Sequence, residues 1–141
     1  MISTRICKIR LAILWFAVGL GLLALMAIQS ILGKYGANVQ EAWSWLLPTV
    51  MPTLSLIIGV LILDATSNRV PDKKVEPFLF NLTFAISVLY LALVTVTVLV
   101  QPFTGLSSLK LMGLSNLWLG PLQGLASAAI GVFFLKAGRG K

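Results

Sequence analysis

Long apolar stretches separated by short polar segments form the main pattern along the chain. Four such stretches run over about 11–32, 46–63, 78–100 and 117–135, and none has a charged residue in its interior. Each is close to the roughly 20 residues that a helix needs to cross a bilayer core. The first stretch is longer than the apolar part of a typical signal peptide, so we expect it to be retained, with cleavage as the alternative. The pattern predicts an all-α integral membrane protein, a single domain over 1–141 formed by a bundle of four transmembrane helices.

The Lys and Arg residues predict the orientation of this bundle. Nine of the 11 lie in the N-terminal segment, the second loop and the C-terminal segment, and only Lys34 and Lys110 lie in the other two loops. Cytoplasmic loops of membrane proteins carry an excess of positive charge. We therefore expect both termini and the loop 66–76 to face the cytoplasm (N-in/C-in), in a bacterial inner (plasma) membrane.

Several residues mark the expected helix boundaries. Trp43, Trp45 and Trp118 flank the second and fourth stretches at the outer side, where amphipathic rings prefer the membrane interface. The pair Asn38 and Glu41 has the spacing of a helix-starting capping pair, and we expect a short interfacial helix there.

Pro48 and Pro52 predict a break or kink before the second span. Two prolines four residues apart leave backbone carbonyls without donors, which is tolerated at membrane depth only inside protein or facing water. A simple kinked entry is one interpretation, and a gate or mouth element is the alternative.

The third stretch has a polar stripe at helical spacing, made up of Thr83, Ser87, Tyr90, Thr97 and Gln101. One interpretation is that these groups bond to preceding carbonyls or to neighbouring helices. The alternative is that they line a water-filled path in an oligomer. The direction in which the stripe points distinguishes the two, because burial against the helices of one protomer excludes such a shared pore.

The fourth stretch has a stripe of small residues, formed by Gly120, Gly124, Ala128 and Gly131, and Ala17 and Gly21 repeat the spacing in the first stretch. Small side chains let two helix backbones approach closely in lipid. The stripe predicts either packing within one protomer or an interface between the subunits of a homo-oligomer.

Composition restricts the chemistry. The chain has no His, one Cys and four acidic residues, so we expect no catalytic triad, metal site or cofactor. Asp64 at the inner end of the second span is expected to pair with Lys136 or Arg10. The positive charges are clustered between spans, which favours anionic lipid head groups over nucleic acid as a partner.

The segment from Trp43 through Trp45, Pro48 and Pro52 to Leu54 resembles a motif of small four-span membrane proteins from bacterial conflict and stress operons. The resemblance covers this one motif and implies a place in bacterial defence. The missing catalytic groups and the small-residue stripe, and not this motif, predict a non-enzymatic protein that oligomerises as a membrane scaffold or pore-type effector with a cytoplasmic protein partner. A channel or transporter for ions or small solutes, using the polar stripe, is the alternative.

Overall fold

The computed structural model describes residues 2–66, 74–100 and 107–138. Four long helices make up nearly all of this part of the chain: α1 (Thr4–Ile31), α2 (Val39–Thr66), α3 (Pro77–Leu99) and α4 (Ser108–Gly138). A single turn of 3-10 helix, η1 (Gly36–Asn38), leads into α2. Two short strands, β1 (Ile2–Ser3) and β2 (Lys74–Val75), pair antiparallel with Ile2 opposite Val75. The four helices are long and apolar enough to cross a membrane, which confirms the predicted helical class and number of candidate spans.

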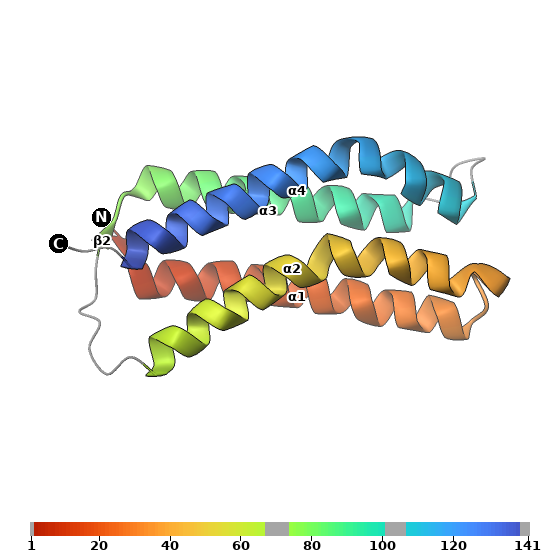
Figure 1. Cartoon of the computed structure of the whole chain (residues 1–141), viewed down its shortest axis with the longest axis horizontal. Coiled ribbons are helices and arrows are strands. Elements are labelled where there is room, and N and C mark those ends of the chain that lie inside the picture. The colour runs from red at the N-terminus through yellow and green to blue at the C-terminus, as the bar shows by residue number, and fades with distance from the viewer. Residues whose placement is uncertain (1, 67–73, 101–106, 139–141) are drawn as a thin grey trace.

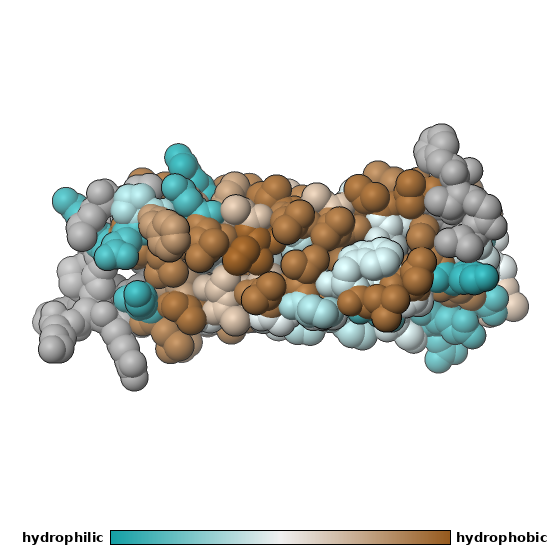
Figure 2. All heavy atoms as spheres, turned by 90° about the horizontal axis from the view of Figure 1, so that it is seen from above, coloured by the Kyte–Doolittle hydropathy of each residue, from teal (hydrophilic) through white to brown (hydrophobic). Residues whose placement is uncertain are grey.

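Successive helices run in opposite directions, so that both termini and β2 lie at one end of the bundle and the α1–α2 connection lies at the other (Figure 1). Around the bundle, α1 packs on α2, α2 on α4, α4 on α3, and α3 on α1. Figure 2 shows an apolar band over the middle of the molecule and hydrophilic residues at both ends. This distribution matches the apolar centre and polar surfaces of a bilayer.

The helices are apolar on their outer faces as well as on their inner faces. The interior contains Trp15 stacked on Tyr90, with ring centroids 5.8 Å apart, and large buried side chains such as Phe133 and Ile130. On the outside, Ile13 and Leu117 are 62% and 72% exposed. Lipid tails solvate such side chains, whereas water does not.

Three helices begin earlier than the apolar stretches predict, whereas α3 agrees closely with the predicted range. α1 begins at Thr4 rather than near Leu11, α2 at Val39 rather than near Leu46, and α4 at Ser108 rather than near Leu117. The first turns of α4 bury Leu111, Met112 and Ser115 and expose Lys110 and Asn116, so the polar residues that lower the hydropathy of this segment do not prevent a helix with one buried side. Lys110 therefore lies in α4 and not in a loop.

At the end with the termini, Asp64 at the end of α2 pairs with Lys8 of α1, and not with Lys136 or Arg10 as expected. The Lys8 Nζ lies 2.6 Å from the Asp64 Oδ2, and the Lys8 side chain is only 8% exposed. A lysine so deeply buried requires a partner for its charge. The ion pair thus accounts for the burial of Lys8, whereas Arg5 and Arg10 of the same segment are exposed.

The opposite end is closed by a tight connection between α1 and α2. Gly33 and Gly36 have positive φ angles of 76° and 54°, a conformation in which glycine avoids the strain of a side chain. The Tyr35 hydroxyl donates a hydrogen bond to the Gln29 side chain at 2.6 Å, and the Trp43 indole donates to Ser30 at 3.1 Å. Burial raises the pKa of the Tyr35 phenol above its usual value.

Gly19 lies at a close approach between α1 and α2. A Cβ atom at this position would lie 3.0 Å from the Val50 Cγ1 and 3.3 Å from a methyl carbon of Leu54. Gly21, two residues along the same helix, has nothing within 4 Å of the equivalent point. The close approach thus depends on Gly19, which lies outside the predicted small-residue pair Ala17 and Gly21.

We predict that Gly19→Leu lowers the free energy of unfolding by about 1–3 kcal/mol relative to Gly21→Leu, because the added side chain overpacks the α1–α2 contact. Both substitutions change helix propensity equally, so the difference isolates the contact. Denaturant unfolding in detergent micelles, followed by circular dichroism, measures it. Equal stability of the two variants would contradict this packing.

Candidate functional site

α2 continues as one helix through both of its prolines. The expected interfacial helix from Asn38 is the first part of α2 itself, and the expected break before the second span is absent. Figure 1 shows the first half of α2 running alongside α1, and the second half changing direction near the middle of the helix. Pro48 and Pro52 therefore mark a redirection of an unbroken helix, in line with the predicted kink.

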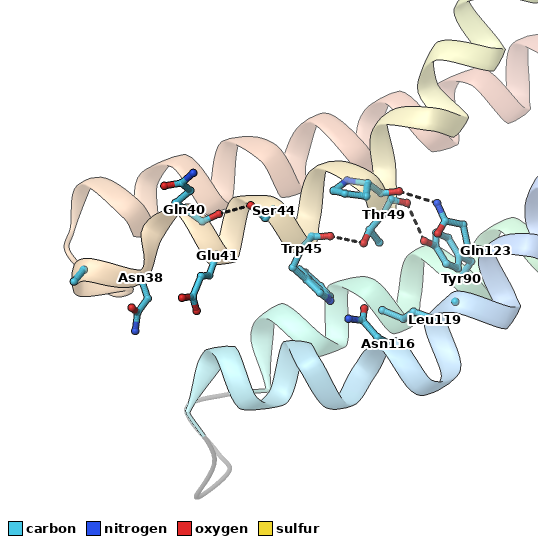
Figure 3. Close-up of a pocket in the computed structure, with 13 residues that line it drawn as sticks. Asn38, Gln40, Glu41, Ser44, Trp45, Thr49, Tyr90, Asn116, Leu119 and Gln123 are labelled. Carbon is cyan, nitrogen blue, oxygen red and sulfur yellow. Dashed lines mark hydrogen bonds between the residues drawn. The ribbon is translucent and has the colours of Figure 1, made fainter.

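Side chains from α3 and α4 bond the backbone carbonyls at this redirection. Pro52 has no N–H, so it offers no donor to the carbonyl of Pro48 four residues earlier. The Gln123 Nε2 of α4 donates to that carbonyl at 2.8 Å. The Tyr90 hydroxyl of α3 donates to the neighbouring carbonyl of Thr49, also at 2.8 Å, in a fully buried position. We call these two hydrogen bonds the proline clamp (Figure 3).

A polar cleft lies between α2 and α4, extending from the proline clamp toward the end of the bundle opposite the termini. Its volume is about 710 Å³. Its described polar lining residues are Asn38, Gln40, Glu41, Ser44, Trp45, Thr49, Tyr90, Asn116 and Gln123. Figure 3 shows Glu41 and Trp45 of α2 extending toward α4 across the opening, with Tyr90 and Gln123 at the end of the cleft nearest the prolines. The proline clamp thus forms the floor of the cleft.

Trp45 lies in the wall of this cleft. Its place in the sequence predicted instead that it would lie on the outer surface of the bundle, at a membrane interface. It is 8% exposed, and its indole N–H has no hydrogen-bond partner among the described residues. In Figure 3 the ring extends from α2 toward Asn116 on α4. A buried donor without an acceptor is costly, and the residue that carries this one lines the cleft. Trp118, by contrast, is 39% exposed on α4.

The described members of the α3 polar stripe face the interior of the same protomer. Thr83, Ser87, Tyr90 and Thr97 are all buried. Thr83 and Thr97 donate to the carbonyls of Leu79 and Leu93, and Tyr90 belongs to the proline clamp. Gln101 lies outside the described residues. This placement excludes these four side chains as the lining of a pore shared between subunits.

Buried polar groups nevertheless occur along much of the bundle interior. Beyond the proline clamp, the hydroxyls of Thr53 and Ser87 and the indole N–H of Trp15 are buried with no partner among the described residues. Closer to the termini lies the pair of Lys8 and Asp64. Polar groups thus recur from the cleft to the opposite end, within one protomer.

The small-residue stripe of α4 lies on the outside of the bundle. Gly120, Gly124 and Ala128 are exposed, Gly131 is half-buried, and a Cβ at any of the three glycines would meet nothing within 4 Å. Ala17 and Gly21 of α1 are exposed as well. The stripe therefore does not serve the packing of α4 within this protomer, and it remains available to another molecule.

Gln123 is a site residue that the sequence interpretation did not single out, and Glu41 entered it only as a member of a capping pair. Gln123 is an amide within an otherwise apolar stretch, and such a group at membrane depth needs a specific partner. The missing proline N–H identifies a carbonyl that needs a donor. The two signals together predict that an amide or hydroxyl from another helix bonds the kink, although they do not identify which one.

The described residues contain no group of three or more His, Cys, Asp and Glu side chains that could hold a metal ion. Comparisons with protein-family models, curated proteins and solved structures find no match to this chain. Three features of the structure bear on its function: the polar cleft, the polar groups of the interior, and the exposed face of α4.

We predict that Gln123→Leu destabilises the protein by about 1–3 kcal/mol, because it leaves the Pro48 carbonyl without a donor. In a Pro52→Ala background the restored backbone N–H supplies that donor, so the same substitution costs less. Unfolding free energies of the four combinations in detergent give the coupling energy. Asn116→Leu on the same helix is the control and shows no such coupling. A cost for Gln123→Leu that is the same in both backgrounds would rule out the proline clamp.

Proposed function

We propose that this chain is a non-enzymatic protein of a bacterial inner membrane that self-associates through the exposed face of α4. In this proposal it acts as a scaffold or pore-type effector together with a cytoplasmic partner. The observation that carries the proposal is the uncovered stripe of Gly120, Gly124 and Ala128. Open space over three small residues, spaced one turn apart, is the surface that a second helix needs for close approach in lipid.

The contrast with the rest of the surface supports this interface. Many exposed positions elsewhere carry bulky side chains, such as Ile13 and Leu20 on α1 and Leu89 on α3. Lipid tails fill the space around bulky side chains well, but a stripe of small residues gains more dispersion energy from a closely packed helix. Because most soluble and membrane assemblies of one chain are symmetric, a second copy is the simplest occupant.

The end with the termini supports contact with anionic partners. Arg5, Arg10, Lys74 and Lys136 are exposed there. Each basic residue near an anionic leaflet contributes about 1 kcal/mol of attraction. We propose that this end faces the cytoplasm, where it meets the anionic inner leaflet and a soluble protein partner.

We predict that Gly124→Leu weakens self-association roughly tenfold or more, because the larger side chain keeps the two α4 helices apart. Gly59→Leu is the matched control, since Gly59 is an exposed glycine on α2 with nothing within 4 Å. Energy transfer between labelled copies in liposomes, titrated against the protein-to-lipid ratio, measures the association. Gly124→Leu that associates as strongly as the unsubstituted chain would refute the α4 interface.

We predict that cysteine labelling will show the proposed orientation, with both termini in the cytoplasm. With Cys7 replaced by Ser, a cysteine introduced by Asn38→Cys reacts with a membrane-impermeant maleimide added outside spheroplasts. A cysteine introduced by Lys74→Cys reacts only after permeabilisation, because the positive charges retain that end in the cytoplasm. The reverse labelling pattern would show that the termini face outward.

A channel or transporter for ions or small solutes is the second candidate, and it is favoured by the polar groups between the cleft and the Lys8–Asp64 pair. The path would run inside each protomer and not between subunits, because the α3 stripe is buried. Reconstituted liposomes distinguish the candidates: if they retain small ions and neutral solutes while the chain associates normally, this alternative fails.

A further inference from the structure

The polar cleft between α2 and α4 has the properties of a ligand site. Its volume of about 710 Å³ lies within the range of small-molecule pockets in proteins. It combines aromatic and apolar walls with several amide side chains from both helices. Its inner end is fixed by the proline clamp, so the polar groups at the floor are already positioned before any ligand arrives.

The charge of the lining determines the class of ligand. Glu41 is the single charged residue among the described residues that line the cleft, and it has no ion-pair partner in the described part of the chain. Lys34 and Lys110 occur at the same end of the bundle but do not belong to the lining. The lining thus presents one uncompensated carboxylate, which favours a cationic group.

Trp45 adds two further requirements for a ligand of the cleft. It lies one helical turn after Glu41 on α2, so the two side chains lie on the same side of the helix. Its aromatic ring attracts cations, and indole is the strongest of the aromatic side chains in this respect. Its buried N–H, without a partner among the described residues, requires an acceptor oxygen. A ligand that satisfies both residues carries a cation close to an oxygen acceptor.

We propose that this cleft binds a protonated alkylamine bearing a nearby oxygen acceptor, with its ammonium group at Glu41 and its oxygen at the indole N–H of Trp45. The same chemistry is present in the ethanolamine head group of a phospholipid and in free phosphoethanolamine. Asn116 and Gln123 on the α4 side supply further amide oxygens and N–H groups for the remainder of the ligand.

Native mass spectrometry of the full chain in detergent tests this site with three probes: a phosphatidylethanolamine, a phosphatidylglycerol of the same acyl chains, and soluble phosphoethanolamine. We expect the chain to bind the ethanolamine lipid at least tenfold more tightly than the glycerol lipid, which lacks the amine. Glu41→Gln should reduce this binding about tenfold, the loss expected for a charge-assisted hydrogen bond. Trp45→Phe keeps an aromatic ring but removes the N–H, and should also weaken binding.

The control is Glu76→Gln, which removes an exposed carboxylate at the opposite end of the bundle and should leave binding unchanged. Binding of the ethanolamine lipid alone identifies the membrane as the source of the ligand, and binding of both amines identifies the amine group itself as sufficient; either supports the site. Equal binding of the two lipids, no binding of either amine, or full binding by a folded Glu41→Gln variant would overturn it.

Discussion

Within a bilayer there is no water to replace a lost backbone hydrogen bond, and each of the two prolines inside α2 removes one N–H donor from the helix. Pro52 removes the donor to the carbonyl of Pro48, and the structure replaces that donor with the Gln123 amide, while Tyr90 donates to the adjacent carbonyl of Thr49. These two bonds connect the centre of α2 to α3 and α4 at one level of the bundle. Because Tyr90 also stacks on Trp15 of α1, all four helices meet at this level. The redirected second half of α2, the floor of the cleft and the central packing all depend on this arrangement.

The proline clamp also lies between the polar cleft and the polar groups of the interior. On one side of it lie Glu41 and Trp45, which face an accessible space, and on the other lie the hydroxyls of Thr53 and Ser87, which are buried. Tyr90 separates these two regions and is itself fully buried. A ligand in the cleft therefore contacts the same side chains that bond the kink. The cleft and the exposed face of α4 are also adjacent, since Gly120 lines the cleft and begins the small-residue stripe.

Hydropathy alone predicted the helical class and the four candidate spans, because a run of about 20 apolar residues has few alternatives. The prolines predicted the kink, and the spacing of Thr83, Ser87 and Tyr90 predicted a shared helical face. The sequence did not predict which way that face points, because hydroxyls are equally compatible with a pore and with a protomer interior. The start of α4 was missed because Lys110 and Asn116 lower the hydropathy of a segment that buries its other side. The Lys8 partner of Asp64 and the burial of Trp45 depend on which helices are neighbours, and a single sequence does not specify that.

The Lys8–Asp64 pair joins residues that are 56 positions apart in the chain. During synthesis, Lys8 is thus made long before the carboxylate that neutralises it, and the pair forms only after the whole of α2 has been added. The Lys8 Nζ also lies 5.9 Å from the centroid of the Phe134 ring of α4, so the surroundings of this charge are complete only once α4 has been added. The β1–β2 ladder becomes possible between these two steps, because β2 follows α2 and precedes α3. The order of the chain therefore sets the order in which these contacts become available: the Lys8–Asp64 pair first, the β1–β2 ladder next, and the contact with Phe134 last.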